Sequence, residues 1–169
     1  SDHDGETEAI INNINVKALV TDKIPNFKKG RCDFYFYKLK GESDNDSSLV
    51  IYLKILDSTF LFTGDIESKG EEYILTKDIQ NIDFLKVSHH GSNTSSSYTF
   101  LNKMNPKISL ISVGLNNKYN HPNSECLKRL NDINSRVYRT DLDGSITIKI
   151  YRNFKIIKKY KSDKKNRYF

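Results

Sequence analysis

The sequence predicts a single-domain α/β sandwich, with helices outside and sheets inside. Two observations lead to this fold class. Segments of strand composition, expected to pair mostly antiparallel, dominate the chain up to Thr63, and strands alternate with helices after Gly64. The chain has 169 residues, which is enough for one domain with a real core, and no repeat or linker divides it.

The first part of the chain is read from helical spacing, strand composition and turn residues. Acidic residues open the first helix, and a polar pair at Asp57 and Ser58 divides two apolar runs into a hairpin. The expected elements are a helix at 5–14, a strand at 16–20, a basic loop at 25–31, a strand at 34–39, a polar turn at 41–48 and hairpin strands at 49–56 and 59–63.

After Gly64 the pattern changes to apolar runs separated by helical segments. A loop dense in small polar residues follows the first of these strands. The expected elements are a helix at 67–77, a strand at 84–87, the polar loop at 88–97, a helix around Phe100, a strand at 108–113, a helix at 124–131 and strands at 137–138, 146–150 and 154–157.

Composition and charge narrow the classes of function. Hydrophobic residues make up 37% and charged residues 28%, which is typical of a soluble globular protein. No apolar run approaches the roughly 20 residues of a membrane-spanning helix. The net charge of +6 suits a phosphate-bearing partner such as nucleic acid. Much of the excess lies in a basic tail at about 158–169, which is either a solvated tail or a phosphate-attracting segment.

Two cysteines, Cys32 and Cys126, lack CxxC spacing, so neither a disulfide framework nor a thiolate metal site is expected. The four histidines are better candidates for metal chemistry, because neutral imidazole and carboxylate are the usual ligands of zinc and manganese. His3 stands between two aspartates, and His89 and His90 stand together in SHHGS after a strand. A lone histidine is more often structural, but two adjacent imidazoles among small polar residues make poor core material.

Asp65 and His121 each allow two interpretations. Asp65 follows Gly64 at the end of an apolar strand, where a carboxylate can bridge two metal ions, or it caps the helix that begins near Glu67. His121 precedes Pro122 in a loop after another strand, and proline biases the preceding residue towards an extended backbone. The imidazole is therefore either held as a ligand or proton donor, or it caps the helix that begins at 124.

Taken in order, six segments closely resemble the hydrolase domain of the ComEC competence DNA-uptake family and its standalone relatives, within the metallo-β-lactamase superfamily. The resemblance covers nearly the whole chain, and six motifs in the right order are more specific than any one of them. The segments are NDSSL at 45–49, LFTGDIE at 61–67, LKVSHHGSNTSSS at 85–97, PKISLISVG at 106–114, NKYNHP at 117–122 and YRTDLDG at 138–144.

The resemblance implies an αββα sandwich with a divalent metal centre, zinc or manganese and one or two ions, at one edge of the sheets. Asp2 and His3 would be ligands of the second metal, Asp65 would bridge, and His90 would complete the site. His89 and His121, together with Asp65, would form the catalytic group, the histidines acting on the substrate side or in proton transfer.

Two features depart from the family pattern. The His-x-His pair that should precede Asp2 and His3 is absent, together with the first strands of the fold. No histidine lies between His3 and Asp65, where many members have another ligand. The expected fold is therefore incomplete at its N-terminal side, corresponding to the C-terminal two-thirds of the domain.

The leading functional hypothesis is a metal-dependent phosphodiesterase or nuclease that uses a metal-bound hydroxide, with nucleic acid as substrate. One alternative is hydrolysis of a small phosphoester or lactone on the same fold. Another is a degenerate, non-catalytic domain that binds nucleic acid or a protein partner. The resemblance implies a cytoplasmic location for a standalone protein and the extracytoplasmic face of the membrane for part of an uptake channel.

Overall fold

The computed structural model describes residues 25–40 and 43–161. The expected helix at 5–14 and strand at 16–20, together with Asp2 and His3, lie outside the described residues. In chain order the elements are β1 (Phe27–Lys29), β2 (Cys32–Tyr37), β3 (Val50–Ile55), β4 (Ser58–Phe62), α2 (Ser68–Leu75), β5 (Phe84–Lys86), the 3-10 turn η1 (Ser88–Gly91), α3 (Tyr98–Met104), β6 (Ile108–Ile111), α4 (Ser124–Asp132), β7 (Arg136–Arg139), α5 (Thr140–Asp143), β8 (Ser145–Ile150) and β9 (Lys155–Tyr160).

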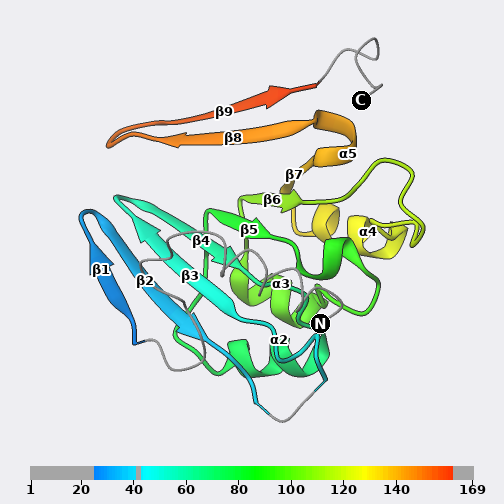
Figure 1. The fold of residues 1–169 in the computed structure, drawn as a ribbon, viewed down its shortest axis with the longest axis horizontal. Helices are drawn as coiled ribbons and strands as arrows, with labels where there is room; N and C mark the ends of the chain where they lie inside the picture. The colour runs from blue at the N-terminus through cyan, green and yellow to red at the C-terminus, as the bar shows by residue number, and fades with distance from the viewer. Residues whose placement is uncertain (1–24, 41–42, 162–169) are drawn as a thin grey trace, which may run out of the picture.

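Strands β1 to β7 form one mixed sheet whose spatial order equals their sequence order (Figure 1). Strands β1 to β4 pair antiparallel, and β4 to β7 pair parallel. Each parallel pair is joined by a crossover that contains one helix, first α2, then α3, then α4. The expected α/β organisation, with antiparallel strands first and alternating strands and helices afterwards, is confirmed.

The main core lies between the sheet and helices α2, α3 and α4. Residues of the sheet that face this core alternate along each strand with residues of the opposite face, as the pleat requires. The fully buried side chains here include Leu61 and Leu85 from the sheet, Ile74 and Phe100 from α2 and α3, and Leu130 from α4.

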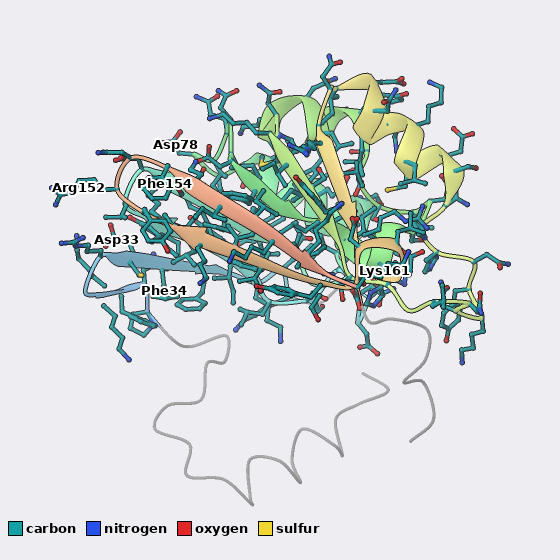
Figure 2. The ribbon with its side chains drawn as sticks, turned by 90° about the horizontal axis from the view of Figure 1, so that it is seen from above. Asp33, Phe34, Asp78, Arg152, Phe154 and Lys161 are labelled. Carbon is teal, nitrogen blue, oxygen red and sulfur yellow. The ribbon has the colours of Figure 1, made fainter. Side chains whose placement is uncertain are left out.

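The hairpin of β8 and β9 lies against the other face of the sheet. Lys155 in β9 places its ammonium 5.4 Å from the ring centroid of Phe84 and pairs with Asp83 at 3.0 Å. Figure 2 shows this hairpin from above, with Arg152 and Phe154 at its tip. The described residues thus build a helix layer, a seven-stranded sheet and a second, smaller β layer, consistent with the metallo-β-lactamase-like sandwich.

The expectation of a loop over 25–31 was wrong for residues 27–29, which form strand β1. The strand is stabilised by stacking of Phe27 on Phe34, with centroids 4.8 Å apart, and by the Lys28–Asp33 ion pair at 3.2 Å. Gly30, with φ of +62°, makes the turn between the two strands. At the other end, residues 158–160 of the expected basic tail lie in β9, and residues 162–169 are outside the described part.

Two further findings bear on the architecture. The short helix α5 directly after β7 was not expected from the sequence. In the described part of the chain, no helix has the length and apolar character needed to cross a membrane.

Candidate active site

The candidate residues come together because of the parallel half of the sheet. Asp65 follows β4, His89 and His90 follow β5, and His121 is in the loop after β6. Carboxyl ends of neighbouring parallel strands meet at one edge of a sheet, and ligands bind outside that edge in open α/β folds. The sheet therefore brings these four side chains to the same edge from three separate loops.

Asp65 is held by a sharp turn after β4. Gly64 has φ of +58°, and a Cβ atom at that position would stand 2.7 Å from Ser48 Cβ, so glycine is required there on both counts. The Asp65 backbone N–H donates to Ser48 Oγ at 3.1 Å, which ties the turn to the 43–49 loop.

Helix α2 is capped by Asp46 and not by Asp65. The Asp46 carboxylate accepts hydrogen bonds from the backbone N–H groups of Glu67 at 2.8 Å and Gly70 at 2.7 Å. The helix-cap interpretation of Asp65 therefore finds no support in the structure, because another carboxylate already serves the first turn.

The Asp65 carboxylate faces two nitrogen-bearing side chains. Its Oδ1 atom lies 3.7 Å from Lys86 Nζ and 3.9 Å from His90 Nε2. Lys86 also donates to the Gly64 carbonyl at 3.1 Å. Burial lowers the pKa of the Lys86 ammonium, and the Asp65 carboxylate partly opposes that shift.

His90 is oriented as a metal ligand would be. Its Nδ1 atom lies 2.7 Å from the Ser112 carbonyl oxygen, which can only accept, so Nδ1 carries the proton. In the neutral imidazole the opposite ring nitrogen, Nε2, is then free of a proton and can ligate a metal ion, and it faces Asp65. Anchoring one imidazole nitrogen on a backbone carbonyl while the other binds a metal is the usual arrangement for histidine ligands.

The backbone of the SHHGS segment is strained at both histidines. His89 and His90 have φ of 45° and 52°, in the left-handed region that side chains with a Cβ rarely adopt. Strain of this kind concentrates at functional sites. Here it directs two adjacent imidazoles to different neighbours, His90 to Ser112 and Asp65, and His89 to Glu67.

His121 lies next to His89, with ring centroids 5.8 Å apart in an edge-on arrangement. The side chain of Asn117 holds its backbone on both sides, accepting from the His121 N–H at 2.9 Å and donating to its carbonyl at 2.7 Å. Helix α4 is capped by Asn123, whose Oδ1 accepts from the Glu125 N–H at 2.9 Å, so His121 is not its cap.

The environment of His121 favours the neutral imidazole. Burial lowers its pKa, and the nearby His89 and His90 rings lower it further. Its Nδ1 atom is buried and, within the described part of the chain, has no hydrogen-bond partner. A buried polar atom without a partner is costly in a purely structural residue, which is a reason to look for a ligand or substrate contact.

The described residues supply part of a metal site. Asp65 and His90 have suitable donor atoms 3.9 Å apart, and their chemistry fits zinc or manganese. Among residues 25–40 and 43–161, no group of three or more His, Cys, Asp or Glu side chains is placed to hold a metal ion. Catalytic zinc sites use three protein ligands, and the two further candidates, Asp2 and His3, lie outside the described residues.

Three residues at this edge were not singled out from the sequence: Glu67, Lys86 and Thr94. Two of them had a weak positional signal, since Glu67 stands two residues after Asp65 and Lys86 lies just before SHHGS. Nothing in the sequence indicates that Thr94 donates a hydrogen bond to Glu67, 27 positions before it, or that Glu67 contacts His89.

Comparisons with known proteins agree with this architecture. The family model described as the metallo-beta-lactamase superfamily matches residues 42–114, which contain Asp65, His89 and His90. ComE operon protein 3 of Bacillus subtilis is 34% identical over 90% of this chain and 24% of its own length. Competence protein ComA of Neisseria gonorrhoeae is 37% identical over 68% of this chain and 17% of its own length.

Recombination protein 2 of Haemophilus influenzae is 33% identical over 66% of this chain and 14% of its own length. The chain thus spans about a quarter, or less, of the length of these relatives. The family match, the relatives, the mixed sheet and the residues gathered at its edge agree. The chain belongs to the metallo-β-lactamase superfamily and is a ComEC-like member of it.

Proposed function

We propose that this chain is a metal-dependent hydrolase domain that cleaves phosphodiester bonds in nucleic acid. Membership of a superfamily that consists mostly of hydrolases, and similarity to competence proteins, support a hydrolase or competence-related role. The observation that carries the finer proposal is the meeting of Asp65, His89, His90 and His121 at one edge of the sheet, from three different loops.

In this proposal Asp65 and His90 hold the metal together with Asp2 and His3. A bound zinc or manganese ion would supply Lewis acidity towards the phosphoryl oxygens and would activate water. The hydrogen bond from His90 Nδ1 to the Ser112 carbonyl, at 2.7 Å, keeps Nε2 available as a donor atom.

His89 and His121 are the groups proposed to handle protons. Their rings are 5.8 Å apart, and burial and the neighbouring histidines lower the pKa of His121, which favours the neutral imidazole that a general base needs. Lys86 adds a positive charge beside Asp65 that can help to neutralise a phosphoryl group.

Substitution of Asp65 by asparagine tests the proposal, because it keeps the size of the side chain and removes its charge. Asp65→Asn should lower bound metal and reduce hydrolysis of a phosphodiester by about 100-fold or more, with a melting temperature close to that of the unmutated chain. Asp57→Asn is the matched control, since Asp57 is exposed in the turn between β3 and β4 at the opposite end of β4. Full activity in Asp65→Asn would refute the proposed role of Asp65.

The same assay decides the substrate class. Single- and double-stranded DNA, RNA, bis(p-nitrophenyl) phosphate and a lactone should be compared at equal metal loading. The net charge of +6 predicts that binding of nucleic acid weakens steeply as salt increases. Hydrolysis of the lactone or the small phosphoester alone would favour the small-ester alternative.

A second candidate function is metal-free binding of nucleic acid or a protein partner. One observation favours it: the Lys86 ammonium lies 3.7 Å from Asp65 Oδ1 and can neutralise that carboxylate without a metal ion. Elemental analysis after dialysis against zinc and manganese separates the two functions. A chain that retains less than one equivalent of metal per molecule, and still binds nucleic acid, would support the second candidate.

A further inference from the structure

We infer that Glu67 is a positioning residue for His89, which it orients and keeps as the tautomer protonated on Nδ1. The inference rests on the proposed function, in which His89 handles a proton. It assigns a role to a carboxylate outside the expected metal ligands and to Thr94, the hydroxyl that orients this carboxylate.

The contacts of Glu67 point to His89 and not to its own helix. Glu67 is the N-cap residue of α2, yet its side chain makes no capping hydrogen bond. Its Oε1 atom lies 3.1 Å from His89 Nδ1 and accepts a hydrogen bond from Thr94 Oγ1 at 2.6 Å. The helix terminus is served by Asp46 instead, which leaves the Glu67 carboxylate available for the imidazole.

The carboxylate is partly buried, with 26% of the Glu67 side chain and 27% of the His89 side chain exposed. A hydrogen bond to a charged group is stronger where water is partly excluded. An ionised carboxylate can only accept, so Nδ1 of His89 donates the proton of this bond. In the neutral imidazole Nε2 is then unprotonated, and it is the ring nitrogen that does not face Glu67.

Thr94 belongs to a loop whose backbone is fixed by hydrogen bonds to two buried or partly buried side chains, Glu71 and Arg129. The backbone N–H groups of Ser96 and Ser97 donate to the buried carboxylate of Glu71, the second at 3.1 Å. On the other side, Arg129 donates to the carbonyls of Ser95 at 2.9 Å and Ser96 at 2.8 Å. Side chains of helices α2 and α4 thus hold the backbone of residues 95–97, which fixes the position of the neighbouring Thr94.

The site therefore contains two histidines with the same tautomer but different anchors. His90 is anchored on the Ser112 carbonyl and His89 on the Glu67 carboxylate. The two anchors differ in charge, because the Glu67 side chain is a carboxylate and the Ser112 anchor is a neutral carbonyl. His89 is therefore the histidine that is oriented by a charge-assisted hydrogen bond.

The test compares Glu67→Ala and Glu67→Gln with the unmutated protein. All three are made as the whole 169-residue chain and loaded with zinc. Glu72→Ala is the matched control, because Glu72 lies on the same helix with 66% of its side chain exposed. Two readouts are needed: the ¹⁵N chemical shifts of the His89 ring, which report the tautomer, and kcat and KM for bis(p-nitrophenyl) phosphate.

In the unmutated chain and in Glu72→Ala, His89 should show one protonated nitrogen, Nδ1. Glu67→Ala should give a mixture of tautomers and a kcat about 10- to 100-fold lower, with KM changed less than twofold. Glu67→Gln should keep the Nδ1–H tautomer and recover part of kcat, because the amide oxygen still accepts. A rise in KM with kcat unchanged, or an unchanged tautomer in Glu67→Ala, would overturn the inference.

If the unmutated chain hydrolyses no phosphodiester, the proposed function fails, and the ¹⁵N shifts alone decide the role of Glu67. The Nδ1–H tautomer in the unmutated chain and its loss in Glu67→Ala would then still support the positioning of His89. A mixed tautomer in the unmutated chain would refute it.

Discussion

Substitution of Gly91 by alanine tests how the loop that carries His89 and His90 is held against the loop that carries His121. Gly91 ends the SHHGS turn with φ of +83°, and its carbonyl accepts from the Asn123 N–H at 2.8 Å. A Cβ atom at Gly91 would stand 2.6 Å from Pro122 Cβ and 3.2 Å from Pro122 Cα. Alanine must therefore push apart the loops that carry His90 and His121.

The expected cost has a backbone part and a packing part. A left-handed backbone at a residue with a Cβ costs about 1–2 kcal/mol, and overpacking of this severity costs about 1–3 kcal/mol. Alanine also lowers the conformational entropy of the unfolded chain, which offsets about 0.4–1 kcal/mol of this cost. Gly91→Ala should thus lower the free energy of unfolding by about 1–4 kcal/mol.

Gly30→Ala measures the backbone part alone, so its difference from Gly91→Ala gives the packing part. Gly30 has φ of +62°, but a Cβ there would have no atom within 4 Å. It should cost only the backbone part, about 0–1.6 kcal/mol after the entropy correction. Urea unfolding at pH 7 measures both variants, and phosphodiester hydrolysis should fall in Gly91→Ala alone. Equal destabilisation by the two substitutions would refute the argument that Gly91 packs the loops together.

Three further predictions concern the cap, the pH response and His121. Asp46→Ala should destabilise the fold by about 1–2 kcal/mol in urea unfolding, through loss of the α2 cap, whereas Asp44→Ala, at an exposed position, should change it by less than about 0.5 kcal/mol. Burial alone would raise the pKa of Asp83, but lysine hydrogen bonds lower it to about 2. The unmutated chain should therefore have a higher free energy of unfolding than Asp83→Asn above about pH 4, and this difference should disappear as pH falls towards 2. Urea unfolding at several pH values measures it, and a difference that does not depend on pH would contradict the prediction. His121→Ala should cut turnover steeply at unchanged metal content if His121 moves protons, and should lower both if it is a ligand; no change in either would make it a scaffold residue.

Much of the fold can be predicted from the sequence because hydrophobic periodicity is a local property. The hairpin at β3 and β4 and the alternation of strands and helices after Gly64 are read from runs of a few residues. Strand β1 was missed because its three residues, Phe27 to Lys29, are exposed and two of them are lysines. They form a strand only through pairing with β2.

The candidate site can be predicted in part for a related reason. Asp65, His89, His90 and His121 all follow apolar strands, so a parallel arrangement of those strands is enough to bring them to one edge. The placement of Asp2 and His3 at the same edge stays a prediction. Which atom of each side chain faces which partner could not be read from spacing.

The α/β class, the order of most elements and the residue types available for chemistry at the strand ends follow from the sequence alone. The packing of sheet, helices and loops places Asp46 at the start of α2, where it caps the helix, and leaves Asp65 to face Lys86 and His90. The same packing brings Glu67 to His89 and Thr94 to Glu67. The physical reason is that periodicity and composition act between neighbours in the chain. A hydrogen bond between residues more than 20 positions apart depends on how the sheet, helices and loops pack, and short stretches of sequence do not encode that packing.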